Sequence, residues 1–431
     1  MSTHRSIHRV PERLSYEYEC SIEAEDPNSY RTGRYFPVHL WDVFGKDGRY
    51  RVTHKLGWGG FATVWLARDD VYNSNVLLKI ININKDIGAT AQEFQILHHL
   101  QHSSIAQENA SHPGRHAVVQ LRDSLDLSVS HRCLVLDVLG MEVQARADRH
   151  SQKNRGSRLP RETALRVVRQ VVLGLDYLWK CGVAHGDLHI RNVLFTAPAM
   201  SRLSEEQIMS RLGRPETGAV RRRDGRRRCD PSIPAYLIRP VSIYGSDAEV
   251  KIVDFGNAFF HQNPPQQLST PWHVRAPEAL YGQPLSKYVD MWSMGCLLFE
   301  LITGRTFVDS FLADRISVMA DLKATLGQPP AKWYEGLDDS EARQAIIETP
   351  TRDMTFHRYF QLSYDQDDSQ LPGIEDDEDE IPVEEFEKPP REFSDRELQA
   401  LFGILSRLPS DGPTERGTPE TLLEALAHEG I

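Results

Sequence analysis

Two segments of the sequence carry side chains suited to phosphoryl transfer. The first is the run His-Gly-Asp-Leu-His-Ile-Arg-Asn from His185 to Asn192, which follows a helix-like stretch. In such a loop Asp187 can accept a hydroxyl proton, and Asn192, five residues later, can bind a metal ion. The second segment is Asp-Phe-Gly, which begins at Asp254 after a strand-like run. Mg²⁺ prefers a carboxylate or two together with phosphate oxygens, so Asp254 and Asn192 would suit it.

A glycine-rich stretch nearer the start of the chain is suited to binding phosphate. It reads Gly57-Trp58-Gly59-Gly60-Phe61-Ala62-Thr63-Val64. Glycines let the backbone approach phosphate oxygens that a side chain would block, although a plain hairpin turn is the alternative. Lys79 on the next strand-like run favours phosphate, because a lysine on a buried strand needs an anionic partner. Glu93, on a predicted helix fourteen residues later, could pair with Lys79, although taken alone it would be a surface residue.

Two groups of secondary-structure elements must position these residues. From Tyr50 onward, short β-branched and apolar runs alternate with glycine, which is typical of strands and tight turns. A helix is predicted around residues 89–100 and a further strand over 133–139. Helical periodicity then dominates, over 161–180, 289–303, 394–407 and 418–428. A strand-rich first portion followed by a helix-rich second portion predicts a two-lobed α+β fold.

Composition and charge exclude several classes of protein. The chain has 431 residues, of which 40% are hydrophobic, so it can form a sizeable core. Its 50 basic and 61 acidic residues give a net charge of −11, which argues against a general nucleic-acid binder and suits a basic partner or simple solubility. The five cysteines include no CxxC pair, which argues against a disulfide scaffold or zinc site. We expect no signal peptide and no membrane span, because no sufficiently long apolar run occurs.

Two highly charged stretches interrupt this pattern of predicted strands and helices, at 196–249 and 364–390. The first contains six arginines within Arg221–Arg228, and the second contains the six consecutive acids Glu375–Glu380. Blocks of this kind are typically solvated or disordered, which is the interpretation we favour for both. The arginine block could instead be a nuclear-import patch or an internal mimic of a basic substrate. The acidic block could fold over it.

These segments occur in the order of the protein-kinase signature, and the sequence resembles eukaryotic protein kinases over residues 50–428. The resemblance also rests on Arg275-Ala276-Pro277-Glu278 and on Arg416 far downstream. It implies an N-lobe over 50–139, a C-lobe over 140–428 with the two charged stretches as insertions, and an N-terminal arm over 1–49 that docks on the N-lobe.

The resemblance implies a role for each candidate residue. Asp187 would be the catalytic base, with His189 beside it, and Asn192 and Asp254 would bind Mg²⁺. The Lys79–Glu93 pair would hold the α- and β-phosphates of ATP. The remaining residues implied to bind ATP are Leu56, Gly57 to Val64, Asp137, Leu139 and Leu194, with Leu77 against adenine and Leu136 as the gatekeeper. Glu278 would bridge to Arg416, Asp290 would anchor the catalytic loop, and Leu97, Phe255 and His185 would form a stack.

The resemblance narrows to SR-protein kinases of the fungal type, within the CMGC group. It does so through the segments Glu25–Tyr30, Gly33–Tyr35, Asp254–Ala258 and Leu326–Pro330. Such kinases phosphorylate serines in arginine/serine-rich proteins, a basic substrate class that suits the net charge of −11. The resemblance further implies a monomer in the cytoplasm or nucleus, with no direct contact to nucleic acid or membrane.

Two positions depart from the kinase pattern. Gly186 replaces the arginine that normally pairs with a phosphorylated activation loop, so we expect activity that does not depend on loop phosphorylation. His189 replaces a lysine, and a histidine with a pKa near ~6.5 would be a weaker partner for the γ-phosphate, with Arg191 as a partial substitute. A longer Ser269–Val274 segment leaves the serine or threonine preference open. Two alternatives therefore stay open: a pseudokinase-like binding module, and a small-molecule kinase of the aminoglycoside-kinase type.

Overall fold

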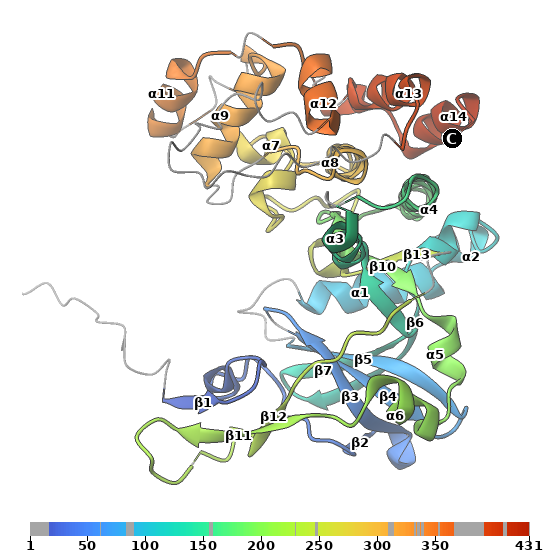
Figure 1. The fold of residues 1–431 in the computed structure, drawn as a ribbon, viewed down its shortest axis with the longest axis vertical. Helices are drawn as coiled ribbons and strands as arrows, with labels where there is room; N and C mark the ends of the chain where they lie inside the picture. The colour runs from blue at the N-terminus through green and yellow to red at the C-terminus, as the bar shows by residue number, and fades with distance from the viewer. Residues whose placement is uncertain are drawn as a thin grey trace, which may run out of the picture. The chain divides into compact units, whose positions relative to one another are not determined.

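A computed structural model of the chain divides into two compact units. It describes residues 17–60, 62–82, 90–154, 158–228, 230–245, 249–308, 314–331, 333, 337, 340–351, 354–365, 392–407 and 412–430. The first unit contains residues 1–91, 120–140 and 197–245, and the second contains residues 92–119, 141–196 and 246–431 (Figure 1). The first is rich in strands and the second in helices, which confirms the predicted α+β class.

A six-stranded antiparallel sheet forms the centre of the first unit. Its strand order is β2-β3-β4-β5-β7-β6. The strands are β2 (Val43–Phe44), β3 (Tyr50–Trp58), β4 (Ala62–Asp69), β5 (Ser74–Asn82), β6 (Leu121–Ser128) and β7 (His131–Leu136). Lys79 lies on the interior strand β5, opposite Val64 of β4 and Leu134 of β7.

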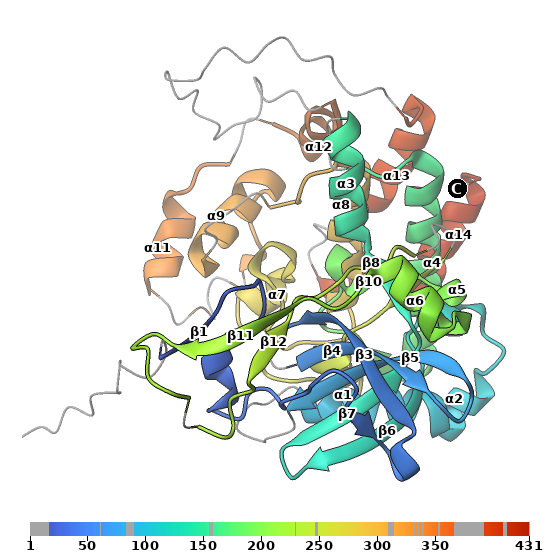
Figure 2. The ribbon, with the colours of Figure 1, turned by 60° about the horizontal axis from the view of Figure 1, so that its bottom comes forward.

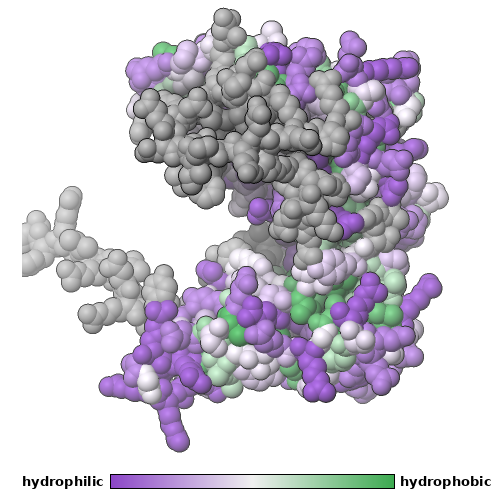
Figure 3. All heavy atoms as spheres, in the orientation of Figure 1, coloured by the Kyte–Doolittle hydropathy of each residue, from purple (hydrophilic) through white to green (hydrophobic). Residues whose placement is uncertain are grey.

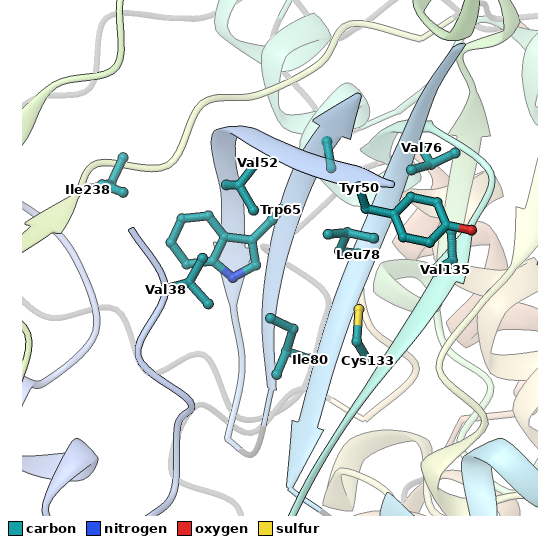
Figure 4. Packing of buried hydrophobic residues seen from close by; sticks show 11 residues of the cluster. Val38, Tyr50, Val52, Trp65, Val76, Leu78, Ile80, Cys133, Val135 and Ile238 are labelled. Carbon is teal, nitrogen blue, oxygen red and sulfur yellow. The ribbon is translucent and has the colours of Figure 1, made fainter. Parts of the chain in front are cut away.

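A cluster of buried side chains covers one face of this sheet (Figure 4). Trp65 and Leu78 are at its centre, 1% and 0% exposed. Val38 from the N-terminal arm and Ile238 from the 197–245 segment complete the cluster. The hydrophobic face of the sheet is therefore covered by two segments that are far apart in the sequence.

The arm and the 197–245 segment also pair with each other. Strand β1 (Tyr18–Cys20) runs antiparallel to β11 (Thr217–Arg222), which in turn pairs with β12 (Tyr236–Ile238) (Figure 2). A short 3-10 helix, η1 (Pro27–Tyr30), follows β1, and two short helices, α5 (Pro198–Arg202) and α6 (Glu205–Leu212), precede β11.

The structure therefore contradicts the expectation of a solvated loop over 196–249. Residues 197–245 form strands and helices, and they belong to the first unit instead of the lobe to which the sequence analysis assigned them. In β11 the buried residues Gly218 and Val220 alternate with exposed ones, so the high charge hides a strand pattern. Hydrophilic side chains gather over β1 and β11 (Figure 3). Arg226, which follows β11 in the sequence, is 82% exposed. The acidic block Glu375–Glu380 lies outside the described residues.

Two long helices form the core of the second unit. Helix α4 (Arg161–Lys180) buries an apolar stripe that includes Val168, Val171 and Leu175. Helix α8 (Val289–Thr303) is buried on nearly all sides. Two short antiparallel pairs, β9 (Val183–Ala184) with β14 (Phe259–Phe260) and β10 (Val193–Thr196) with β13 (Val250–Ile252), lie beside the segments predicted to be catalytic.

The other α-helices of the described residues are α1 (Thr90–His102), α2 (Ser104–Glu108), α3 (Val143–Asn154), α7 (Pro277–Leu280), α9 (Arg315–Leu326), α11 (Ser340–Glu348), α12 (Phe356–Asp365), α13 (Asp395–Leu405) and α14 (Pro419–His428). Strand β8 (Leu139–Glu142) leads into α3. The helices that the structure describes are too short or too polar to cross a bilayer.

Candidate active site

The glycine-rich stretch forms the hairpin turn between β3 and β4. Gly57 pairs with Val64 and Trp58 with Thr63, and the Gly59 N–H donates to the carbonyl oxygen of Ala62 at 2.9 Å. Phe61 lies outside the described residues. A Cβ added at Gly57, Gly59 or Gly60 would meet no described atom within 4 Å, and none of the three has a positive φ. The described fold itself therefore does not require glycine here, and the open space above the turn fits the phosphates of a nucleotide.

The residues predicted to surround adenine lie on the same sheet and on the segment after it. Leu77 on β5 is opposite Leu136 on β7, and both are buried. Leu139 is buried as well, and the carboxylate of Asp137 accepts a hydrogen bond from Arg122 Nε at 2.5 Å. Leu56 packs against a neighbouring apolar cluster. Their roles toward adenine stay predictions.

Lys79 and Glu93 are placed in different units of the structure. Lys79 belongs to the first unit, whereas Glu93 lies on α1 within the second and is 1% exposed. Their ion pair stays a prediction. Leu194 on β10 also belongs to the second unit. The burial of Glu93 rules out the alternative that it is an exposed helix residue.

A buried carboxylate anchors the loop that contains Asp187. The backbone N–H groups of His185 and Gly186 donate to the two carboxylate oxygens of Asp290 on α8, at 2.7 and 2.8 Å. Asp290 is completely buried, and burial raises its pKa to about 6, against the lowering effect of these two hydrogen bonds. Asp290 thus ties the loop to the most buried helix of the unit.

Gly186 is fixed by its backbone conformation and by close packing. Its φ is 74°, a left-handed conformation that other residues adopt at a cost. A Cβ at this position would lie 2.5 Å from the carbonyl oxygen of Asn257 and 3.2 Å from Leu268. Backbone conformation and packing therefore both favour glycine at position 186, where the kinase resemblance leads one to expect an arginine.

Asp187 has one carboxylate oxygen that accepts a hydrogen bond and one that has no partner among the described residues. Asn257 Nδ2 donates to Asp187 Oδ2 at 3.1 Å, and Asn192 Nδ2 donates to the Asp187 backbone carbonyl at 2.9 Å. Oδ1 is buried and has no hydrogen-bond partner among the described residues. Burial, followed by the nearby charge of Asp254, raises the pKa of Asp187 to about 7. A buried acceptor of this kind is suited to a hydroxyl group that arrives with a substrate.

His189 lies beside Asp187 as a neutral ring. Its Nδ1 accepts the backbone N–H of Arg191 at 3.2 Å, and its Nε2 lies 3.9 Å from Asp187 Oδ1. Burial and then the nearby His185 and His273 lower the pKa of His189 to about 4. At pH 7 the ring therefore carries no charge. Because Nδ1 accepts a hydrogen bond, the proton of the neutral ring is on Nε2. His189 can therefore donate a hydrogen bond at the position where the kinase pattern has a positively charged lysine.

Asp254 starts a tight turn after β13. Its backbone is left-handed, with φ 66° and ψ 75°, and the 3-10 turn Phe255–Asn257 follows. The ring of Phe255 meets that of His185 edge-on, with centroids 4.9 Å apart, and His185 Nε2 is 3.0 Å from the Val253 carbonyl oxygen. Two members of the predicted stack therefore touch.

Sequence reasoning did not foresee the interactions that tie the activation segment, from Asn257 to Arg275, to the catalytic loop. Thr270 is buried, and its hydroxyl donates to the Gly186 carbonyl at 2.6 Å. Arg275 Nε donates to the Thr270 carbonyl at 2.8 Å, and its guanidinium stacks on Trp272 at 3.6 Å. The only sequence signals were the Asn257 that follows Asp-Phe-Gly and the arginine of Arg-Ala-Pro-Glu.

The predicted structural bridge is present at the other end of that segment. Arg416 makes two parallel hydrogen bonds of 2.7 Å with Glu278, and both side chains are 1% exposed. The described residues contain no group of three or more His, Cys, Asp or Glu side chains that could hold a metal by themselves. Asn192 and Asp254 would therefore need phosphate oxygens as further ligands, as is usual for Mg²⁺.

Comparison with known proteins assigns the family. The family model for the protein kinase domain matches residues 50–205 and 240–347. The chain belongs to the protein kinase family. Protein kinases use ATP, typically with Mg²⁺, and the open glycine turn, the unpaired Asp187 oxygen and the Asn192–Asp254 donor set fit these groups.

Within the family, the similarity is to SR-protein kinases. Serine/threonine-protein kinase SRPK of Physarum polycephalum is 30% identical over 298 residues, which are 65% of this chain and 66% of that protein. SRSF protein kinase 3 of Mus musculus is 38% identical over 177 residues, 40% of this chain and 29% of that protein. Dual specificity protein kinase KNS1 of Saccharomyces cerevisiae is 28% identical over 290 residues, 67% of this chain and 35% of that protein. The chain thus spans 66% or less of the length of these relatives.

Proposed function

We propose that this protein is a serine/threonine kinase that transfers the γ-phosphate of ATP to serines in basic, arginine/serine-rich proteins. The observation that carries this proposal is the buried Oδ1 of Asp187, an acceptor that has no partner among the described residues, while Asn257 holds the other carboxylate oxygen and Asn192 holds the backbone carbonyl. A substrate hydroxyl would donate to this oxygen, and Asp187 would accept its proton during transfer.

The other residues bind and orient the reactants. The glycine-rich turn leaves room for the ATP phosphates, and Lys79 would contact them from β5. Asn192 and Asp254 would hold Mg²⁺, which when bound neutralises charge that develops on the phosphoryl oxygens. Neutral His189 would donate a hydrogen bond from Nε2–H near the same oxygens. Phosphoryl transfer needs positioning and charge stabilisation more than covalent chemistry, and these groups supply both.

Two features support activity without activation-loop phosphorylation. Gly186 leaves no arginine to receive a phosphorylated loop. Uncharged groups instead hold the loop, through the hydrogen bond from Thr270 to the Gly186 carbonyl and the one from Asn257 to Asp187. Treatment with a phosphatase should therefore leave most of the activity in place, and a large loss would overturn this part of the proposal.

A basic substrate is supported by the charge of the chain and by its relatives. The net charge is −11, and it stays −11 when the six arginines of Arg221–Arg228 and the six acids of Glu375–Glu380 are left out, so the acidity belongs to the rest of the protein. The relatives include kinases named for SR-protein substrates. We further propose a monomer in the cytoplasm or nucleus that binds neither nucleic acid nor membrane directly.

One assay distinguishes the proposed kinase from its two rivals. Wild-type protein and Asp187→Asn are incubated with labelled ATP, Mg²⁺ and either an arginine/serine-repeat peptide or a pool of metabolites. We expect transfer to serines of the peptide by the wild type, and a loss of at least a hundredfold in the variant. Label in the metabolite pool alone would identify a small-molecule kinase. ATP binding with no transfer above that of Asp187→Asn would identify a pseudokinase.

A further inference from the structure

The two segments of the first unit that the kinase family model does not match form one structure. We call the described parts of residues 17–49 and 206–239 the accessory layer. Its two halves join through the β1–β11 pairing. They also share an apolar cluster of Tyr18, Tyr30, Tyr35, Val220, Ile233 and Leu237. The arm is therefore docked by side chains of the insertion as well as by the sheet.

The accessory layer contacts the glycine-rich turn directly. The hydroxyl of Tyr35 donates to the carbonyl oxygen of Gly59 at 2.8 Å. Tyr35 is 6% exposed, and the ring of Tyr30 packs against it edge-on, with centroids 5.6 Å apart. A packed tyrosine has few rotamers, so this hydrogen bond restrains the turn without a further cost in side-chain freedom.

A second contact holds the strand that leads into the turn. Lys55, two residues before Gly57, donates from Nζ to Glu25 Oε2 of the arm, and Tyr30 donates to the other carboxylate oxygen. The Lys55 and Glu25 side chains are both 0% exposed. Burial lowers the pKa of Lys55, against the raising effect of Glu25. A lysine at this depth needs its anion, so undocking of the arm would leave a buried charge without its partner on the strand that leads into the turn.

We propose that Tyr35 and Glu25 position the glycine-rich turn, so that docking of the arm sets the affinity of the protein for ATP. This inference rests on the proposed function, which assigns the turn to the ATP phosphates. The reason is physical. A Cβ added at Gly57, Gly59 or Gly60 would meet no described atom within 4 Å, so the space beside the turn is open and an undocked turn would lose freedom when phosphate binds. Anchoring one carbonyl beforehand removes part of that loss from the binding step.

Tyr35→Phe tests the contact by removal of a single hydroxyl. Tyr18→Phe is the matched control, because Tyr18 lies in the same cluster of the same arm but its hydroxyl interacts with Arg222 of β11 instead of with the turn. The dissociation constant for a fluorescent ATP analogue with Mg²⁺ should rise about two- to tenfold in Tyr35→Phe, the range expected for one hydrogen bond, and stay unchanged in Tyr18→Phe. KM for ATP should rise in parallel while kcat at saturating ATP stays the same. Amide hydrogen exchange over residues 57–64 should increase only in Tyr35→Phe.

Glu25→Gln tests the buried pair and carries its own check on folding. The single substitution leaves Lys55 buried beside a neutral group, so the nucleotide dissociation constant should rise more than tenfold and the melting temperature should fall. Glu25→Gln combined with Lys55→Met removes both charges and should recover most of the melting temperature and of the affinity. A double variant no better than the single one would refute the role of the pair.

The failure of this inference can be told apart from the failure of the proposed function. Equal affinity and equal exchange over residues 57–64 in Tyr35→Phe and Tyr18→Phe would overturn the inference, even if the wild type is an active kinase. A wild type that binds no ATP would overturn the proposed function and, with it, the link between docking and affinity. Increased exchange in Tyr35→Phe alone would then still show that Tyr35 holds the turn.

Discussion

Replacement of Gly186 by alanine should destabilise the protein and disturb the catalytic loop. Two costs add at this position. The left-handed backbone, with a φ of 74°, costs a residue with a Cβ about 1–2 kcal/mol. The new Cβ would also lie 2.5 Å from the carbonyl oxygen of Asn257, and relief of such overpacking costs about 1–3 kcal/mol. The free energy of unfolding should therefore fall by about 2–5 kcal/mol.

Gly182 provides the matched control for this experiment. It has the same φ of 74°, but a Cβ there meets no described atom within 4 Å. Gly182→Ala should therefore cost only the backbone term of about 1–2 kcal/mol. Urea unfolding of both variants, analysed by linear extrapolation, isolates the packing term as the difference between them. Kinase activity should fall further in Gly186→Ala, because movement of Asn257 removes the hydrogen bond that orients Asp187.

Equal destabilisation of the two variants would refute this reasoning. It would mean that the Asn257 carbonyl moves away at no cost, and that Gly186 is kept for its φ alone. A Gly186→Arg variant that is stable, active and newly responsive to loop phosphorylation would be a stronger contradiction. It would show that the loop can accept the arginine of other kinases, and that the proposed independence from loop phosphorylation lacks a structural cause.

Three further perturbations have defined outcomes. Glu278→Gln leaves Arg416 buried without its anion, so urea unfolding should show a loss of about 3–5 kcal/mol. Thr270→Val keeps the shape but leaves the Gly186 carbonyl unbonded, which should cost about 1–3 kcal/mol and increase hydrogen exchange in the activation segment. Burial and then Lys287 lower the pKa of His261 to about 4. As the pH falls, the histidine is therefore protonated in the unfolded chain before it is protonated in the folded protein, so stability should fall as the pH drops from 6.5 toward 4. His261→Asn should remove about 2 kcal/mol of the loss between pH 7 and pH 5 in urea unfolding.

An exposed ion pair provides a control for the buried one. Glu216→Gln breaks an ion pair with Arg239 whose side chains are 55% and 41% exposed, and it should change the stability by less than about 1 kcal/mol. A loss as large as that of Glu278→Gln would contradict the argument from burial. Unchanged exchange in Thr270→Val would mean that its hydroxyl does not hold the segment. An identical pH dependence in His261→Asn and the wild type would contradict the assigned pKa.

The long helices could be predicted from the sequence because their signal is local. The 161–180 and 289–303 predictions coincide with α4 and α8, since an apolar stripe in one case and an unbroken apolar run in the other persist over several turns. The proximity of site residues within one loop could be predicted in the same way, because Asp187 and Asn192 are separated by only five positions. Their spacing is set by the chain itself.

Contacts between distant segments could not be predicted in this way. Gly186 appeared in the sequence only as a missing arginine, whereas the structure shows a glycine required by a carbonyl 71 positions later. His189 was expected to be mostly neutral at a pKa near ~6.5, but burial takes the pKa to about 4. Burial depends on the assembled unit, so neither the packing nor the pKa has a signature in local sequence.

Charge misled the prediction for the insertion for a different reason. Composition averages over neighbours, but a strand alternates between its two faces, so β11 can bury Gly218 and Val220 beside Arg221 and Arg222. The guanidinium of Arg222 is then used structurally, against Glu17 of the arm and Asp224 of its own hairpin. A block that is six-eighths arginine can thus help to pair two segments, provided that carboxylates from elsewhere meet it.

In both units, buried side chains form hydrogen bonds to the backbone of the segments that are predicted to contact ATP or its substrate. In the second unit, Asp290 and Thr270 hold the catalytic loop from opposite sides, through N–H groups and a carbonyl of His185 and Gly186. In the first, Tyr35 holds the carbonyl of Gly59. Each of these contacts is made to a backbone group, which is present whatever side chain the held residue carries. A kinase held in this way would reach its working geometry when it folds, and this is the physical basis on which we propose activity without phosphorylation of the activation loop.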